Sequence, residues 1–278
     1  MTNSIIFPIH EEQIQEFTQI ICTYSGIDLS GYSRSFLVRK LQREIHDSGC
    51  SSCGAYLAIL RNDHERSFGA MQSFTINYTE FFRDPEFFLA LRNKVMPFLA
   101  TYPSIKIWVA GCSTGEEAYS LAILLNEVNL LSRCSILATD INPENLSKAE
   151  SGIFDASMVR NATSKFYLGG GRTAFHDYVT FGYDKIIFRD GIRERISFVK
   201  HDLTCGKIPG QFHLILCRNV LIYFGRNLQN DVIGMFYEGI RNLGYLGLGL
   251  QENLLFNKHA NRYSIIDRDA KIYRKVDH

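Results

Sequence analysis

The sequence predicts an α/β protein, with a doubly wound Rossmann-like sheet, a small inserted antiparallel β subdomain and an N-terminal all-α domain. Three observations predict this fold. About the first seventy residues show helical spacing of apolar side chains and no strand pattern. From Lys106 onward, short apolar strands alternate with helices, and β-rich pieces separated by glycine turns follow Tyr178. We expect a helical domain over residues 1–73 and a sheet domain over 74–278, with the insertion at about 175–198.

Apolar residues at helical spacing predict three helices before this boundary. They are Ile14, Phe17, Ile21 and Tyr24 in the first, Leu37, Leu41 and Ile45 in the second, and Tyr56, Leu57 and Leu60 in the third. The polar segment Arg61 to Arg66 is expected to be a connector. The second helix places Arg39, Lys40 and Arg43 opposite its apolar residues, and composition alone favours a solvated basic face.

The elements of the sheet domain are predicted from their order along the chain. Asp84-Pro85-Glu86 provides an N-cap, a first-turn proline and a first-turn acid, so a helix is expected from about Pro85 to Leu99. Strands are expected at 106–110, 135–138, 197–200 and 214–217, with helices after Gly115 and Asn142. A helix over about 227–243, a strand at 244–249 and a hairpin near 264–275 fit antiparallel closing strands. The inserted sheet is expected from pieces at 178–181, 185–188 and 195–198.

Composition limits the classes of function. The 278 residues are 46% hydrophobic and carry a net charge of +1, which permits a full core and argues against nucleic acid or an anionic membrane as the main partner. No stretch approaches the roughly 20 apolar residues that span a bilayer, so we expect a soluble, cytoplasmic protein without membrane insertion. The seven cysteines fit a reducing compartment, Cys50 and Cys53 lack a second ligand pair, and no metal site is predicted.

The loop after the first strand indicates the class of ligand. Strand 107–110 runs into Gly111-Cys112-Ser113-Thr114-Gly115-Glu116-Glu117, where glycines permit close backbone approach by a ligand. The loop lacks the full dinucleotide pattern and the ending of a P-loop, and its two glutamates would repel a pyrophosphate. S-adenosylmethionine has no phosphate but carries a sulfonium and an ammonium. The acidic loop therefore predicts S-adenosylmethionine as cofactor.

The second strand ends in an acid that suits a ribose. Asp140 lies about 25 residues beyond Gly115, where an acid can accept hydrogen bonds from ribose hydroxyls. Taken alone, Asp140 could equally be the N-cap of the helix that starts at Asn142-Pro143. The glycine loop upstream favours the ribose interpretation.

Three blocks of sequence together resemble the CheR family of chemoreceptor methyltransferases. They are Asn77-Tyr78-Thr79-Glu80-Phe81-Phe82-Arg83, residues 113–120 (Ser-Thr-Gly-Glu-Glu-Ala-Tyr-Ser), and Cys217-Arg218-Asn219-Val220-Leu221-Ile222-Tyr223-Phe224. The helical N-terminal module, the segment 148–154 and the inserted sheet share the resemblance. It implies methyl transfer from S-adenosylmethionine to glutamate side chains in the cytoplasmic domain of methyl-accepting chemoreceptors. The products would be glutamyl methyl esters and S-adenosylhomocysteine, and we expect the enzyme to act as a monomer.

The resemblance also implies roles for individual residues. Arg83 and Tyr223 are implied as catalytic, and Arg39, Lys40 and Arg43 as the face that meets the receptor. The implied cofactor-binding residues are Asn77, Thr79, Arg83, Gly111, Glu117, Asp140, Ile141, Asp202, Leu203, Arg218 and Asn219. Asp202-Leu203 stands where the family commonly has Asn-Leu near the adenine. Without the resemblance, Arg83 would be expected to pair with Glu80 or Asp84 and Tyr223 to pack beside Phe224.

One segment departs from the family pattern. After the fifth strand, family members often have Gly-His-Ser-Glu, and this chain has Gly249-Leu250-Gln251-Glu252. The change leaves open a second hypothesis, that the acceptor is another protein or a small molecule. A third hypothesis is a non-catalytic signalling adaptor, and the intact Arg83, Glu117, Asp140 and Tyr223 weigh against it.

Overall fold

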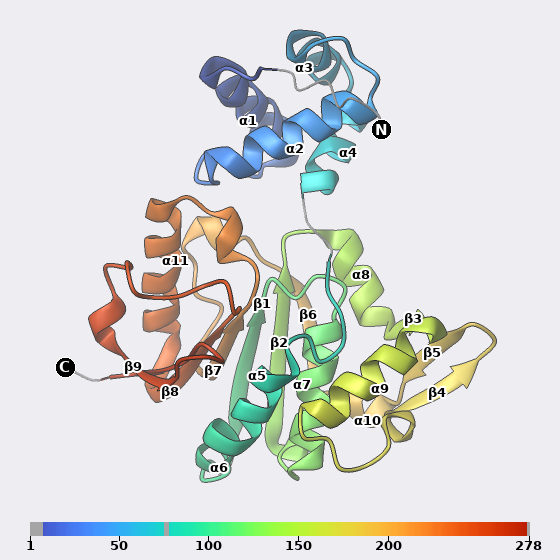
Figure 1. The fold of residues 1–278 in the computed structure, drawn as a ribbon, viewed down its shortest axis with the longest axis vertical. Helices are drawn as coiled ribbons and strands as arrows, with labels where there is room; N and C mark the ends of the chain where they lie inside the picture. The colour runs from blue at the N-terminus through green and yellow to red at the C-terminus, as the bar shows by residue number, and fades with distance from the viewer. Residues whose placement is uncertain (1–7, 75–77, 277–278) are drawn as a thin grey trace. The chain divides into compact units, whose positions relative to one another are not determined.

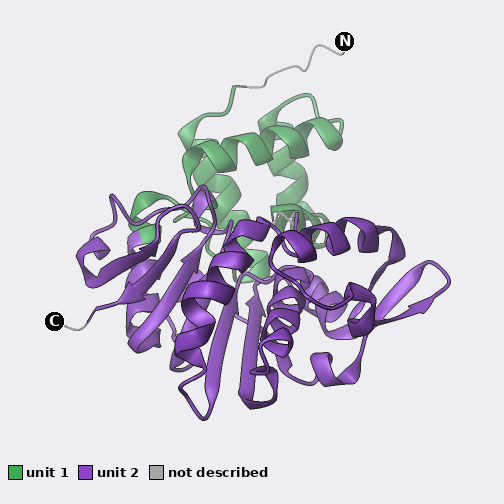
Figure 2. Cartoon of the chain, turned by 60° about the horizontal axis from the view of Figure 1, so that its bottom comes forward, with its two compact units in different colours: residues 1–76, 223–229 green, residues 77–222, 230–278 purple. Residues whose placement is uncertain are grey.

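The computed structural model describes residues 8–74 and 78–276, which fall into two compact units (Figure 2). One unit comprises residues 1–76 with 223–229, and the other comprises 77–222 with 230–278. None of the helices within the described ranges combines the length and hydrophobicity that a bilayer crossing requires.

The first unit is all-α, and the described helices are α1 (Glu11–Ser25), α2 (Arg34–Asp47), α3 (Cys53–Asn62) and α4 (His64–Phe74). Their apolar faces meet in a core that includes Phe17, Phe36 and Phe74. The expected connector at Arg61 to Arg66 is wrong, because only Asp63 separates α3 from α4. The polar residues there lie on the outer face of a helix, which residue type alone does not distinguish from a loop.

The segment Tyr223–Gln229 joins this helical unit although it lies far along the chain. The amide of Ser33 donates to the carbonyl of Tyr223 at 2.8 Å, and the amide of Gly225 donates to the carbonyl of Gly31 at 2.8 Å. The ring of Tyr223 lies 5.0 Å from that of Phe36. Backbone pairing and aromatic packing therefore hold this segment to the loop before α2.

The second unit contains a seven-stranded mixed sheet in the order β6-β2-β1-β7-β8-β10-β9 (Figure 1). Its strands are β1 (Ile105–Ala110), β2 (Cys134–Asp140), β6 (Ile196–Lys200), β7 (Phe212–Cys217), β8 (Ile240–Leu248), β9 (Tyr263–Asp267) and β10 (Ile272–Lys275). The five strands from β6 to β8 are parallel. Strand β10 is antiparallel to both β8 and β9. The predicted doubly wound fold class is confirmed.

Helices cover both faces of this sheet, and this explains the apolar run 107–110 in β1. The helices are α5 (Pro85–Ala90), α6 (Met96–Leu99), α7 (Glu116–Glu127), α8 (Pro143–Ser151), α9 (Val159–Leu168), α10 (Asp190–Arg193) and α11 (Arg226–Gly239). Trp108 packs against Phe236 of α11, whereas Ile107 and Val109 join the core formed with α5 and α7. A strand covered on both faces is typically a nearly continuous apolar run.

Three predictions about the elements of the sheet domain need correction. Helix α11 ends at Gly239, and residues 240–243, expected as helix, begin β8, because Ile240 pairs with Phe212. Strand β8 is parallel to β7 and so is not one of the antiparallel closing strands. The helix expected from Pro85 to Leu99 contains a π-helical turn at Leu91–Val95 between α5 and α6.

The predicted inserted sheet is present, but its third strand was wrongly placed. It consists of β3 (Ile153–Asp155), β5 (Lys185–Phe188) and β4 (Val179–Gly182), all antiparallel, in that order. Residues 195–198, expected as its third piece, belong instead to β6 of the main sheet. The ring of Phe188 stacks on Tyr119 of α7 at 4.3 Å, and this packing anchors the insertion to the main sheet.

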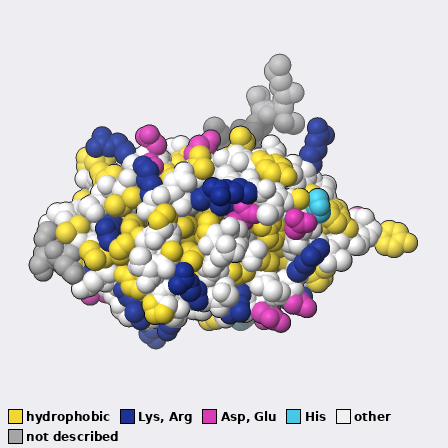
Figure 3. Space-filling model, turned by 90° about the horizontal axis from the view of Figure 1, so that it is seen from below, with side chains coloured by type: hydrophobic (Ala, Val, Ile, Leu, Met, Phe, Trp, Pro, Cys, Tyr) yellow, Lys and Arg dark blue, Asp and Glu magenta, His cyan; other side chains and the backbone are white. Residues whose placement is uncertain are grey.

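Charges of both signs are mixed with apolar side chains on the face of the molecule shown in Figure 3. This distribution agrees with the net charge of +1. Any recognition of a charged partner must therefore use a local group of residues.

Candidate functional site

The parallel strands bring the predicted residues of the sheet domain to one edge of the sheet. Strands β6, β2, β1 and β7 end at Lys200, Asp140, Ala110 and Cys217. Within two residues of these strand ends, in the same order, stand four predicted cofactor-binding residues: Asp202, Ile141, Gly111 and Arg218. In doubly wound sheets, ligands bind outside the carboxyl ends of the strands. This carboxyl edge is the candidate active site.

The glycine loop and Asp140 form one hydrogen-bonded unit. The amides of Gly111 and Cys112 both donate to the carbonyl of Thr139 at 2.8 Å, and the amide of Ser113 donates to Oδ2 of Asp140 at 2.8 Å. Gly111 has a φ of 76°, and a Cβ there would lie 2.5 Å from Val220. Both its backbone conformation and the lack of space therefore require glycine.

Asp140 does not cap the following helix. Its Oδ1 accepts from the amide of Asn142 at 2.9 Å, and it is Asn142 that caps α8 by accepting from Glu144. Burial raises the pKa of Asp140, although backbone amides counteract it. Of the two interpretations of Asp140, the cap is excluded.

Arg218 neutralises two acids in a buried cluster. Its Nη1 donates to Glu117 Oε2 at 2.6 Å and its Nη2 to Asp84 Oδ2 at 2.7 Å. The guanidinium lies 4.1 Å from the ring centroid of Phe87, and its side chain is 1% exposed. Asp84 was expected to cap α5, but its backbone is left-handed and its side chain binds Arg218 instead. The cluster fixes the orientation of Glu117 with one carboxylate oxygen engaged.

Arg83 lies beside this cluster but takes no part in its ion pairs. Its carbonyl accepts from Arg218 at 3.0 Å, its Nη1 donates to the carbonyl of Tyr78 at 3.1 Å, and its guanidinium lies 5.2 Å from the ring of Tyr78. Neither alternative partner pairs with it, since Glu80 pairs with Lys165 and Asp84 with Arg218. Within the described residues, Arg83 therefore forms no ion pair.

The other predicted residues are placed as follows. Thr79 is half-buried, and Asn77 lies outside the described residues. Asp202 accepts from the amide of Thr204 at 2.8 Å, and Leu203 is buried. Asn219 has a left-handed backbone with a φ of 60°. Tyr223 belongs to the helical unit, so its role at this edge stays a prediction.

The basic face of α2 is smaller than expected. Arg39 is exposed, and Arg43 is exposed with Nε 3.6 Å from Asp47. Lys40 instead turns its Nζ to the carbonyl of Ser73 on α4, and burial lowers its pKa. Lys40 follows Phe36 by four residues and Leu37 by three, so it lies on their side of the helix. Counting Lys40 in the solvated face was wrong.

Two acids of this edge were missed as site residues. Glu116 is 3% exposed, and its carboxylate accepts from Thr114 Oγ1 at 2.7 Å; burial raises its pKa. Glu252 is 4% exposed and accepts four backbone hydrogen bonds. The available signal for Glu252 was that Gly249 and Glu252 match the ends of the Gly-His-Ser-Glu segment often found in the family.

The edge suits a cationic cofactor that contains hydroxyls. The enclosed Ser113 hydroxyl makes no hydrogen bond to the part of the chain that the structure describes, and neither does Glu117 Oε1. Glu117 Oε1 can therefore receive a ligand, since its side chain is 14% exposed, and the acidic groups around it favour positive charge. In the described ranges, no group of three His, Cys, Asp or Glu side chains is arranged to hold a metal ion. Burial raises the pKa of Cys112 and Cys217 well above the usual value, so both thiols stay protonated.

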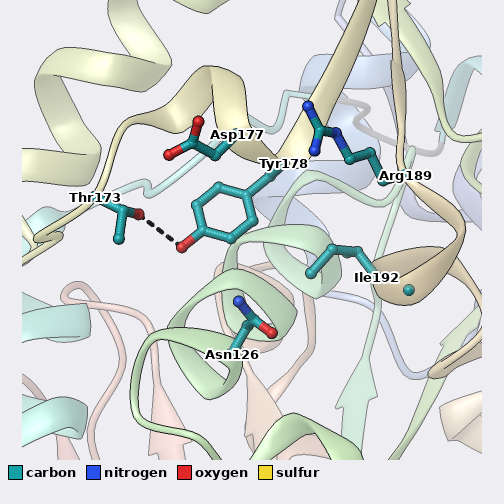
Figure 4. A pocket seen from close by; sticks show the side chains of 7 residues that line it. Asn126, Thr173, Asp177, Tyr178, Arg189 and Ile192 are labelled. Carbon is teal, nitrogen blue, oxygen red and sulfur yellow. Dashed lines mark hydrogen bonds between the residues drawn. The ribbon is translucent and has the colours of Figure 1, made fainter.

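A separate hollow of about 330 Å³ lies at the base of the insertion, near the end of α7 opposite the glycine loop (Figure 4). Asp177 and Arg189 flank Tyr178, whose hydroxyl is 2.8 Å from that of Thr173, and Asn126 lies across from it. No residue implied by the family resemblance lines this hollow. The carboxyl edge of the sheet therefore remains the candidate active site.

Fold and site together define a Rossmann-like methyltransferase with an N-terminal helical domain. Residues 77–272 match the CheR methyltransferase, SAM binding domain, and residues 12–73 match the CheR methyltransferase, all-alpha domain. The chain belongs to the CheR methyltransferase family, and its cofactor is S-adenosylmethionine, as the acidic loop predicts.

Similar proteins are found among curated sequences and solved structures. A Pseudomonas putida protein with the provisional name methyltransferase Cher3 is 39% identical to this chain, over 95% of this chain and 96% of its own length. The chemotaxis protein methyltransferases of Klebsiella aerogenes and Escherichia coli are each 29% identical over 94% of this chain and 87% of theirs. Among solved structures, the N-methyltransferase NodS of Bradyrhizobium japonicum with S-adenosyl-L-homocysteine matches with a TM-score of 0.34 and 14% identity, covering 61% of this chain and 62% of that one.

Proposed function

We propose that the protein transfers a methyl group from S-adenosylmethionine to glutamate carboxylates in the cytoplasmic domain of methyl-accepting chemoreceptors. The products are glutamyl methyl esters and S-adenosylhomocysteine. The observation that carries the proposal is the contrast between the two arginines of the edge. Arg218 is buried and neutralised by Glu117 and Asp84, whereas half-buried Arg83 forms no ion pair among the described residues. Relatives named chemotaxis protein methyltransferases support the chemotaxis context.

The chemistry needs an oriented acceptor more than a base. A glutamate side chain has a pKa of about 4.3 and is already an anion at neutral pH. When bound, S-adenosylmethionine supplies a methyl group on a sulfonium, which leaves as a neutral thioether. Arg83 holds one carboxylate oxygen by a charge-assisted hydrogen bond and leaves the other to attack. Orientation of two bound partners contributes on the order of 7–11 kcal/mol to lowering a barrier.

The residues around the cofactor divide its recognition between them. Glu117 Oε1 receives the ammonium, and Asp140 with Ile141 receives the ribose. Asp202 and Leu203 border the adenine, and Gly111 permits close backbone approach. Thr79, Arg218 and Asn219 border the reacting centre. Tyr223 positions the acceptor carboxylate or the methyl group.

The helical domain and the insertion are assigned to the receptor. Arg39 and Arg43 of α2 face an acidic receptor surface, whereas Lys40 supports the packing of α2 on α4. The insertion can accept an extended receptor tail by strand addition, because β4 is an edge strand with Phe181 55% exposed.

The test is transfer of radiolabelled methyl to receptor cytoplasmic fragments, with release of the label as methanol in mild base. Arg83→Ala is expected to lower transfer by about 10²-fold, since orientation is lost. Arg262→Ala is a matched control, because Arg262 also stacks on a tyrosine, Tyr237, at 4.8 Å, away from the glycine loop. No base-labile label on any fragment, despite cofactor binding, would favour a different acceptor or a non-catalytic adaptor.

The helical domain has its own test. Arg39→Glu should raise the KM for the receptor fragment, and the effect should weaken as salt rises, since exposed charges are screened. Lys40→Met is the control, and it should leave the salt dependence of KM unchanged. If the KM of both variants responds equally to salt, α2 is not part of the receptor interface.

A further inference from the structure

The buried carboxylate of Glu252 joins two loops at the carboxyl edge. Its Oε2 accepts from the amides of Asn219 at 2.9 Å and Gly249 at 2.6 Å. Its Oε1 accepts from the amides of Val220 at 2.9 Å and Leu221 at 2.7 Å. Both oxygens are thus fully used by backbone groups, and the side chain is closed to solvent. We refer to these five residues as the Glu252 clamp.

The clamp needs a carboxylate and a glycine. A glutamine in place of Glu252 would turn an N–H₂ group toward two backbone N–H donors, because only one of its two terminal atoms is an acceptor. A Cβ on Gly249 would lie 2.7 Å from Glu252 Oε2 and 2.8 Å from the amide nitrogen of Asn219. The backbone would have to move to make room.

The clamp holds the chain that borders the reacting centre. Three consecutive amides, from Asn219 to Leu221, point at one side chain, and Asn219 is kept in a left-handed conformation that non-glycine residues rarely adopt. Arg218, which orients Glu117, directly precedes them. By contrast, Leu250 and Gln251, between Gly249 and Glu252, make none of these four bonds, and Gln251 is exposed.

We propose that Glu252 is a positioning residue for methyl transfer: it acts through the backbone of residues 219–221, which it holds in the geometry that the reacting partners require. The inference rests on the proposed function for its acceptor and on the site placement of Asn219. Glu117 and Asp140 are held by other contacts, so the clamp affects the rate of transfer more than the affinity for the cofactor.

The experiment compares Glu252→Gln, Glu252→Asp and Gly249→Ala with wild type. Calorimetry gives the Kd for S-adenosylmethionine, and single-turnover transfer to a receptor fragment gives the rate per folded molecule. The rate should fall by about 10- to 100-fold in Glu252→Gln, with the Kd unchanged. The rate should recover in part in Glu252→Asp, which restores the two acceptor oxygens. Hydrogen exchange should show that the amides of residues 219–221 lose protection.

Glu127→Gln is the matched control for a merely structural role, because Glu127 is an equally buried carboxylate with several hydrogen bonds at the opposite edge. It should lose stability without losing rate per folded molecule. A Glu252→Gln rate equal to that of Glu127→Gln would overturn the proposal, as would unchanged amide protection.

If Glu252→Gln does not fold, the rate and the amide protection of Gly249→Ala and Glu252→Asp decide by the same criteria. If wild type methylates no fragment, the acceptor assignment fails, and amide protection at unchanged cofactor Kd decides the clamp separately.

Discussion

Two buried glutamates fasten loops to opposite edges of the same sheet. Glu252 does so at the carboxyl edge, where the cofactor residues gather, and Glu127 does so at the far end of α7, at the base of the insertion. Glu127 accepts from Arg92 Nη2 at 3.0 Å, from the Thr173 and Tyr178 hydroxyls at 2.6 and 2.9 Å, and from the backbone amides of residues 172 and 173. Both carboxylates accept at least four hydrogen bonds, but only Glu127 has a cation beside it.

The two carboxylates also differ in the direction of their pKa shift. Burial raises the pKa of Glu127, but hydrogen bonds from Thr173, Tyr178 and Arg92 outweigh it, and the net pKa is lowered. Burial raises the pKa of Glu252, and its four backbone amides do not cancel the rise. The number of hydrogen bonds alone therefore does not set the ionisation of a buried carboxylate. At the base of the insertion the buried carboxylate is paired with a cation, whereas at the carboxyl edge the Glu252 carboxylate is held by backbone amides alone.

The largest expected effect comes from removing the cation of the carboxyl edge. Arg218→Leu would leave Asp84 and Glu117 without their shared partner. Removing one member of a buried ion pair typically costs about 3–5 kcal/mol. Urea denaturation should show a loss of that size, and cofactor binding should weaken because Glu117 loses its orientation. A loss below that of Arg43→Ala, an exposed arginine paired at 3.6 Å, would contradict the buried cluster.

A second prediction concerns the base of the insertion. Glu127→Gln removes the charge that strengthens the hydrogen bonds to this side chain, and since one such bond is worth about 1.5–3 kcal/mol, the free energy of unfolding should fall by at least that amount. The methyl-transfer rate of the folded fraction should stay at the wild-type value, since no cofactor residue contacts Glu127. A reduced rate in fully folded protein would show that the two edges are coupled.

The opposite pKa shifts give the third prediction. Glu127, with its folded pKa below the unfolded value, contributes stability above the unfolded pKa of about 4.5, and this is lost as pH falls through the folded pKa. Burial raises the folded pKa of Glu252, so holding the carboxylate that the clamp requires costs stability, and this cost grows as pH rises through the folded pKa. The free energy of unfolding of wild type minus that of Glu127→Gln should therefore grow as pH rises from 3 to 7. The same difference taken against Glu252→Gln should shrink over that range. Parallel pH profiles in urea denaturation would contradict the comparison.

The sequence was sufficient for features that depend on pattern. Alternating apolar strands and helices predicted the doubly wound sheet, and the acidic glycine loop predicted the cofactor. It was insufficient where a partner far along the chain decides the outcome. Asp84 has the sequence context of an N-cap, yet Arg218, 134 residues later, takes its carboxylate. Lys40 has the charge of a surface residue, yet Ser73 of α4 binds it. Glu252 needs donors from two loops, and residues 219–221 lie 31 to 33 positions before it in the sequence.

The smallest effect is expected at Leu250 and Gln251, which lie between Gly249 and Glu252 of the Glu252 clamp. The double substitution Leu250→His with Gln251→Ser restores the residues common in the family at positions that make none of the four clamp bonds. Surface changes of this kind usually alter the free energy of unfolding by less than about 0.5 kcal/mol. Stability, the Kd for S-adenosylmethionine and the protection of residues 219–221 should all stay at wild-type values, in contrast to Gly249→Ala. If the double variant changes which acceptor fragments are methylated, the segment selects the acceptor while its two ends hold the site. A loss of amide protection would instead show that the middle of the segment is part of the clamp.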